Sequence, residues 1–270
     1  MQIARNLWLI LLCLLCGTSA VVALEFRTYP EFAQLVAIQT SPDGGFGLAG
    51  YLRTQPGRVQ SGFLRIGSNG ERLGRPLALP PPDEQHPQTW VSGLLLLPDG
   101  DYVAAGWAEN PRGKPDGWLI RFTPEGEVVW NVILASDQDQ RIYSVKRHPG
   151  GSLIAVGRVQ EGSDIRQRAQ GYLAFVDPLN GKSRDFQIPF NAETRRSAFQ
   201  DVAVLPDGAL AFTGWVTKAD GTDDIWLLRL NQEGGAPRSI PSLRGLSNPV
   251  SGVSDVQFGE TTFRSWRQTR

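Results

Sequence analysis

Cysteine is nearly absent from this 270-residue chain, and both copies, Cys13 and Cys16, lie within the first 23 residues. Residues 24–270 therefore have no thiol for a disulfide, for nucleophilic catalysis or for a sulfur-ligated metal. An excess of charge is absent too, because 27 Lys and Arg balance 27 Asp and Glu. Nucleic acid is therefore not expected as a partner. A chain without disulfides is compatible with a bacterial periplasmic or surface protein.

The main apolar run is short and lies at the N-terminus, where Leu7–Cys16 reads LWLILLCLLC. It follows Arg5 and precedes small residues up to Ala23, which is the pattern of a secretory signal peptide. We predict a signal peptide over 1–23, cleaved after Ala23 or after Ala20, and a periplasmic or secreted protein with no stable membrane insertion after cleavage. The alternatives are an uncleaved anchor and a lipoprotein attached through Cys16.

Motifs for catalysis or cofactor binding are also scarce. The two histidines are His86, in a proline-rich connection, and His148, beside a turn. A two-histidine metal site would require folding to bring them together. The carboxylates of Asp137–Asp139 and Asp220–Asp224 do not match a calcium-loop spacing. No nucleophile elbow or phosphate-binding loop is present, so we expect no metal and no cofactor.

Glycine and proline are abundant, with 30 and 19 copies, and they mark an internal repeat. Four segments share a proline, a glycine two residues later and a glycine at the end: Ser41–Gly50, Leu97–Gly106, His148–Gly157 and Leu205–Gly214. Their prolines recur every 51 to 57 residues. A Pro-Asp-Gly sequence favours a turn, and the apolar residues that follow favour a buried strand.

A second repeated block follows each of these segments: Gly62–Ile66, Gly117–Phe122, Gly171–Phe175 and Ile225–Leu230. Each block carries an aromatic residue and is followed by a glycine turn. Each repeat thus predicts four short strands, which is typical of a propeller blade. We expect the aromatic residues Phe63, Trp118, Tyr172 and Trp226 to fill the space between blades.

The chain ends leave partial repeats at Leu24–Tyr29 and Val253–Trp266. We predict an all-β fold, a small β-propeller of about five blades over 24–270, with the last blade assembled from both chain ends. Such closure hides strand edges. An open or truncated array, a β-sandwich and a parallel solenoid are the alternatives.

The repeat resembles bacterial secreted β-propeller repeats with Pro-Asp-Gly, a terminal Gly and a Gly-Trp-Leu-x-Arg strand, over residues 33–240. It is distantly similar to quinoprotein-like propellers, through Asp177–Gly181 and Trp130. The second resemblance would imply a quinone cofactor, but the chain lacks the vicinal cysteine pair and has a longer period. Both resemblances imply fold more than activity.

The positions of the loops in a propeller predict which side binds a ligand. The connections between strands two and three should lie on the same side of the propeller as those between blades, here named the connection face. Long loops are expected there at 51–61, 107–116, 158–170 and 215–223, and at 80–90, 135–141 and 189–199. Loops on a rigid scaffold commonly carry binding residues. The candidate ligand-binding residues are Trp90, Trp107, Trp215, Arg141, Arg195, Arg196, Asp137 and Asp139.

Exposed tryptophan and arginine favour a binding surface. We therefore predict a non-enzymatic exported propeller that binds a protein or a glycan on this face. The alternative is a propeller enzyme, either a carbohydrate hydrolase or lyase or a quinone-type oxidoreductase. Trp107 and Trp215 could instead fill gaps between blades. No catalytic residue is assigned.

Overall fold

The computed structural model describes residues 28–55, 58–134, 138–161, 168–187, 194–231, 253–258 and 261–266. Every regular element in these ranges is a β-strand, as predicted, and none of their residues forms a helix that could cross a membrane. The predicted signal peptide lies outside the described residues.

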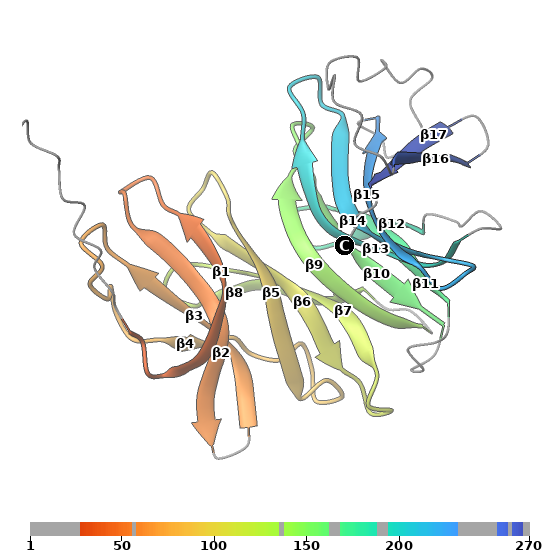
Figure 1. Cartoon of the computed structure of the whole chain (residues 1–270). Helices are drawn as coiled ribbons and strands as arrows, with labels where there is room; N and C mark the ends of the chain where they lie inside the picture. Colours follow the sequence, from red (N-terminus) through yellow and green to blue (C-terminus); the bar gives the residue numbers. More distant parts are fainter. Residues whose placement is uncertain are drawn as a thin grey trace, which may run out of the picture. The chain divides into compact units, whose positions relative to one another are not determined.

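The strands form two four-stranded antiparallel sheets and one nine-stranded sheet that joins the third and fourth blades of a β-propeller fold (Figure 1). The first two blades are β1 (Phe32–Thr40), β2 (Phe46–Gln55), β3 (Arg58–Ile66) and β4 (Leu77–Ala78), then β5 (Gln88–Leu96), β6 (Tyr102–Glu109), β7 (Pro115–Phe122) and β8 (Val128–Leu134). The third blade is β9 (Asp139–Arg147), β10 (Leu153–Gln160), β11 (Ala169–Val176) and β12 (Ser183–Gln187). The fourth contains β13 (Thr194–Val204), β14 (Leu210–Lys218) and β15 (Asp223–Leu230).

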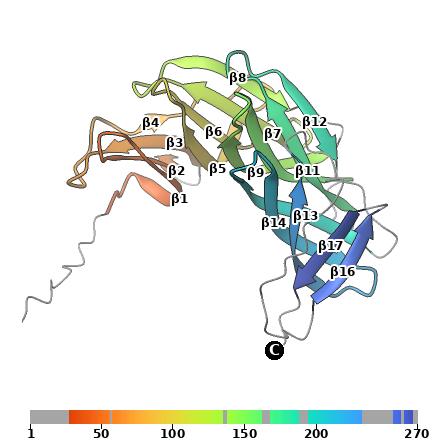
Figure 2. The ribbon, with the colours of Figure 1, turned by 90° about the horizontal axis from the view of Figure 1, so that it is seen from above.

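Neighbouring blades meet through their first strands, because β5 packs against β1 and β9, and β9 packs against β13. Figure 2 shows the blades following one another in chain order. The core lies between the blades. Phe63 of the first blade packs against Tyr102 of the second, with ring centroids 4.6 Å apart. Trp118 belongs to one buried cluster with Phe63 of the first blade, and Tyr172 to another with Leu119 of the second. The predicted role of these aromatic residues between blades is therefore confirmed, while the side chain of Trp226 lies outside the described set.

A β-bulge recurs in the first strand of every blade and explains the repeated glycine of the second strand. The bulged residues are Val36, Ser92, Tyr143 and Gln200. A Cβ at Gly106 would lie 1.8 Å from the carbonyl oxygen of Trp90, and one at Gly157 would lie 1.9 Å from that of Arg141. Only glycine permits the two backbones to approach so closely.

The Pro-Asp-Gly turn and the arginine of the third strand are linked by an ion pair. Arg121 donates hydrogen bonds to Asp99 at 2.6 Å and to Asp101 at 2.8 Å. Arg229 pairs with Asp207 in the same way. The third blade lacks this pair, since Gly150 stands at the aspartate position and Phe175, which pairs with Ile154, stands at the arginine position. These blades therefore have either both the turn aspartate and the arginine or neither of them.

Trp130 joins the second blade to the third. Its indole N–H donates to the carbonyl oxygen of Pro178 at 2.8 Å, and Arg121 donates to the same oxygen at 2.7 Å. Gly181, with φ of +73°, lies against the Trp130 ring, where a Cβ would come within 3.1 Å. The segment that suggested a quinoprotein resemblance thus serves blade docking in this chain.

The expectation of long loops between strands two and three needs correction. At 51–61, 107–116 and 215–223 the strands extend into the expected loops, and short turns such as Asn110–Lys114 and Lys218–Thr222 close the hairpins. Their Gly113 and Gly221 have positive φ, so turn chemistry explains these segments.

The C-terminal strands β16 (Val253–Phe258) and β17 (Thr261–Trp266) form a hairpin, and β17 pairs with β15. The hairpin therefore extends the fourth blade at its open edge, where strand four was expected, instead of beginning a separate blade. Edge strands with unpaired backbone groups favour such additions. Residues 24–27 lie outside the described residues, so the count of about five blades stays a prediction.

Candidate functional site

Tryptophan and arginine side chains form a row on the connection face, where the first and second strands of the blades lie side by side. Trp90 of β5 and Trp107 of β6 are directly opposite each other and stack, with centroids 6.2 Å apart and planes inclined by 9°. The guanidinium carbon of Arg141, in the next blade, lies 5.4 Å from the centroid of Trp107. This is cation–π geometry. Trp107 thus reaches toward the neighbouring blade, as the gap-filling alternative proposed, and remains partly exposed.

The row continues through the third and fourth blades. The guanidinium carbon of Arg196 lies 5.3 Å from the centroid of Trp215. Between the two tryptophan–arginine pairs stands Arg158 of β10, which is directly opposite Arg141 of β9. The Trp–Arg row is defined as Trp90, Trp107, Arg141, Arg158, Arg196 and Trp215.

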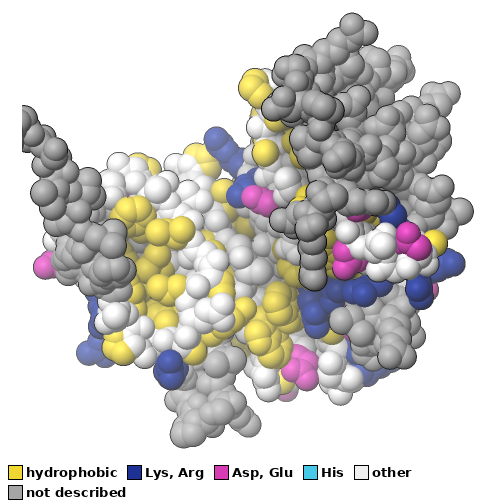
Figure 3. All heavy atoms as spheres, in the orientation of Figure 1, with side chains coloured by type: hydrophobic (Ala, Val, Ile, Leu, Met, Phe, Trp, Pro, Cys, Tyr) yellow, Lys and Arg dark blue, Asp and Glu magenta, His cyan; other side chains and the backbone are white. Residues whose placement is uncertain are grey.

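Arg158 interacts electrostatically with the arginines on both sides of it in this row. Burial is the largest cause that lowers its pKa, and the positive charges of Arg141 and Arg196 lower this pKa further. Tyr143 and Asp139 act in the opposite direction. The three arginines are thus close enough to repel one another. Figure 3 shows Lys and Arg side chains gathered near the strands of the third blade, and hydrophobic side chains over those of the first.

Two groups that can exchange a proton, a carboxylate and a phenol, lie beside the Trp–Arg row. Asp139, the first residue of β9, is buried, and its Oδ1 lies 3.5 Å from Nζ of Lys114 in the second blade. That oxygen accepts no hydrogen bond from the described residues. Tyr143, the bulged residue of the same strand, is partly exposed. A carboxylate and a phenol therefore lie on one strand beside the arginines.

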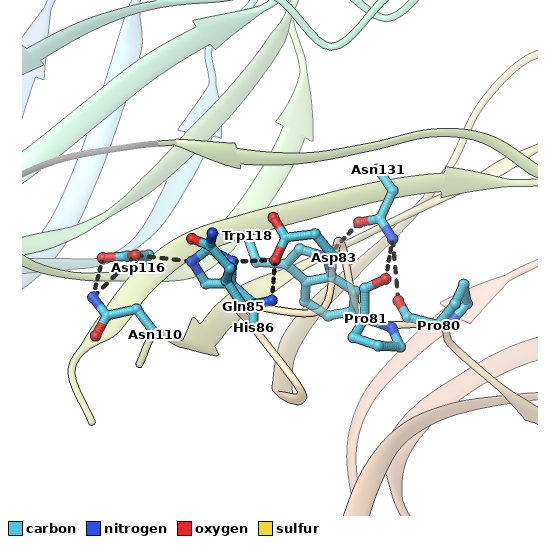
Figure 4. Close-up of polar contacts among 9 residues, drawn as sticks. All are labelled: Pro80, Pro81, Asp83, Gln85, His86, Asn110, Asp116, Trp118 and Asn131. Atoms are coloured by element: carbon cyan, nitrogen blue, oxygen red, sulfur yellow. Dashed lines mark hydrogen bonds and ion pairs between the residues drawn. The ribbon is translucent and has the colours of Figure 1, made fainter. Parts of the chain in front are cut away.

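A second polar centre surrounds His86 on the connection between β4 and β5 (Figure 4). Nδ1 of His86 lies 2.7 Å from Asp83, and Nε2 lies 3.0 Å from Asp116 of β7. Asn110 donates to both carboxylate oxygens of Asp116, at 3.1 and 3.2 Å. Burial alone would lower the pKa of His86, but the hydrogen bonds to the two carboxylates outweigh burial and raise it.

Both ring nitrogens of His86 are therefore occupied, which makes the imidazole a structural cation and not an available base. The same connection is fixed to the second blade by Asn131, which donates to the carbonyl oxygens of Pro80 and Pro81 and accepts a hydrogen bond from Trp118 (Figure 4). His148 has different partners: its Nδ1 accepts from the Gly150 N–H at 3.1 Å. The two histidines serve separate local structures.

Among the candidate residues, the structure brings Trp90, Trp107 and Arg141 together. It also brings Arg196 against Trp215, and it places Asp139 near Arg158. Arg195 is exposed and has no described contact with the row, and Asp137 lies outside the described residues. Arg158 and Tyr143 were missed as site residues. The signal for Arg158 was in the repeat, since the other blades carry Tyr51, Trp107 and Trp215 at that position.

No family profile and no curated protein matches this chain. Among solved structures, the chain is similar to a protein of unknown function from Dyadobacter fermentans, with a TM-score of 0.53, 13% identity, and coverage of 77% of this chain and 68% of that one. A Bacillus subtilis levansucrase follows, with a TM-score of 0.48, 9% identity, and coverage of 91% and 82%. An α-L-arabinofuranosidase from Lactobacillus brevis has a TM-score of 0.45, 13% identity, and coverage of 75% and 69%.

These comparisons correct the functional expectation. The similar structures whose names give an activity are a levansucrase and an α-L-arabinofuranosidase, which does not agree with the predicted non-enzymatic binder, so that prediction is not kept. At 13% identity or less the similarity concerns the fold and assigns neither a reaction nor a catalytic residue to this chain.

Proposed function

We propose that the protein is a carbohydrate-active enzyme whose glycan substrate lies across the Trp–Arg row. The observation that carries the proposal is a group of three neighbouring arginines flanked by partly exposed tryptophan rings, from Trp107 to Trp215. Flat aromatic rings pack against the C–H faces of sugars, and arginine forks bind their oxygen atoms. The row crosses three blades, so it suits a chain of sugars and not a single small ring.

Asp139 and Tyr143 are the groups that we assign to proton transfer. They lie on β9, which also carries Arg141, and both interact electrostatically with Arg158. Glycoside hydrolysis generally uses two carboxyl groups on opposite sides of the bond. Here one carboxylate and one phenol stand beside several cations, an arrangement that suits the removal and return of a proton next to an acidic group.

The predicted leader at 1–23 supports an encounter with polysaccharide outside the cytoplasm, in the periplasm or after secretion. The resemblance to bacterial secreted propeller repeats supports the same location. A fusion of residues 1–30 to a reporter that folds only after export, compared with an Arg5→Glu version, tests this part of the proposal.

The decisive experiment measures cleavage. Purified full-length protein is incubated with neutral and acidic polysaccharides, and both new reducing ends and the ultraviolet absorbance of unsaturated products are followed. Hydrolysis yields reducing ends alone, whereas elimination yields both signals. The expected result is cleavage that falls at least about 100-fold in Tyr143→Phe, because general acid–base catalysis contributes about 10² to 10⁴. Binding of glycan without cleavage in any polysaccharide would refute the enzymatic part.

A further inference from the structure

We propose that Arg141, Arg158 and Arg196 form a subsite for the carboxylate or sulfate group of an acidic glycan. This inference rests on the proposed function and specifies its substrate class. Two independent features of the described residues support it, namely the uncompensated repulsion among the three guanidinium groups and the unpaired N–H groups that they hold out of solvent.

The repulsion follows from strand register. Arg141 and Arg158 are directly opposite each other on β9 and β10, and like charges in such pairs destabilise a sheet. Arg196 adds a third positive charge from the next blade. Among the described residues, Asp139 is the carboxylate that interacts with Arg158, and it is also paired with Lys114. Within the described part of the chain, the cluster therefore has an excess of positive charge.

Arg121 shows how an arginine with a structural role is paired in this chain. Arg121 is buried and donates to Asp99, Asp101 and the carbonyl oxygen of Pro178. In the cluster, by contrast, Nε of Arg141 and Nε of Arg196 are buried and have no hydrogen-bond partner within the described ranges. Buried donors without partners are costly, so this arrangement is understandable if a ligand supplies the acceptors.

The ligand chemistry follows from the donors. Guanidinium groups bind planar carboxylates and sulfate oxygens through paired N–H donors. Trp107 and Trp215 stack against Arg141 and Arg196, so an anion bound by the arginines lies beside two aromatic rings. An anion attached to a sugar ring satisfies both features. Uronic acids and sulfated sugars share this chemistry.

The test separates anion binding from glycan binding. Thermal unfolding is measured with sodium sulfate, sodium galacturonate or sodium chloride at equal ionic strength, for wild type, Arg158→Gln and Arg147→Gln. Arg147 is an exposed residue at the other end of β9 and serves as the matched control. We expect sulfate or galacturonate to raise the wild-type and Arg147→Gln midpoints above the chloride values. The affinity of Arg158→Gln should be at least about tenfold weaker, because one charged hydrogen bond is lost.

Glycan retention in gels that contain polygalacturonate, dextran sulfate or neutral dextran gives the second measurement. Slower migration in polygalacturonate identifies a carboxylate ligand, and slower migration in dextran sulfate a sulfate ligand, provided that Arg158→Gln abolishes it. Retention by neutral dextran alone, unchanged by Arg158→Gln, overturns the subsite and leaves the proposed function standing. Stabilisation by the small anions without retention by any glycan supports the subsite and refutes the proposed function. Arg158→Gln should also raise stability without ligand, and a lower stability would mean that the cluster is structural.

Discussion

The His86 network predicts a stability that depends on pH. The side chains of His86 and Asp116 are each about one-tenth exposed, at 11%, whereas that of Asp83 is 51% exposed. Removing the imidazole in His86→Gln leaves a buried carboxylate with Asn110 as its remaining described partner. Loss of one partner of a buried pair costs about 3 kcal/mol, and the exposed Asp83 arm adds less than about 1 kcal/mol.

For a domain of this size, about 3 kcal/mol corresponds to a fall of about 6 to 12 °C in the unfolding midpoint. The fall should depend on pH. The pKa of His86 is raised in the folded protein, so its contribution is complete below the ordinary value of about 6.5 and is lost as pH rises through the folded value. The difference between wild type and His86→Gln should therefore be largest in mildly acidic buffer and should shrink in alkaline buffer.

The assay is thermal unfolding followed by near-ultraviolet circular dichroism across this pH range, with His148→Gln as control. His148 belongs to a different turn and makes no contact with the network. The unfolding midpoint of His148→Gln should therefore depend on pH above 6.5 in the same way as that of wild type. If His86→Gln keeps this dependence, or if its midpoint equals that of wild type at acidic pH, the assignment of His86 as a paired cation is refuted.

Two further pairs of variants test the blade architecture. Gly106→Ala should cost more than about 3 kcal/mol, because its Cβ would meet the carbonyl oxygen of Trp90, whereas Gly93→Ala, whose nearest atoms lie 3.5 Å away, should be tolerated; the amount of soluble protein and the unfolding midpoint distinguish them. Arg121→Ala should cost about 3 kcal/mol and Arg229→Ala less than about 1 kcal/mol, because the first side chain is 10% exposed and the second 29%. Equal losses in urea unfolding would contradict this account.

The sequence predicted the blades because turn chemistry and repetition are local signals. Pro98, Asp99 and Gly100 specify a turn whatever surrounds them, and four copies of one pattern imply one structure repeated. The length of the hairpins was misjudged for the opposite reason. The segment around Asn110 and Gly113 is polar, and only pairing across the sheet shows that the flanking strands continue to Glu109 and start again at Pro115.

The sequence predicted some of the residues of the Trp–Arg row. Trp107 and Trp215 were identified from their position after the repeated glycine. Trp90, Arg141 and Arg196 were identified because they lie in the expected connections, but the stacking of these side chains depends on how neighbouring blades pack. The His86 network could not be foreseen, because Asp83 and Asp116 come from different elements and are 33 residues apart in the chain. Distances between blades are set by tertiary packing, which no local pattern encodes.

The third blade departs from the repeat on both sides of the propeller. On the turn side, this blade replaces the Asp–Arg ion pair with Gly150 and Phe175. On the connection face it has Arg158, where each of the other blades has an aromatic residue. An aromatic residue there would pack between blades without repulsion, so arginine opposite Arg141 lowers the stability of the free protein. Residues that lower stability in this way are expected at functional sites, which supports the proposed subsite for an acidic group at Arg158.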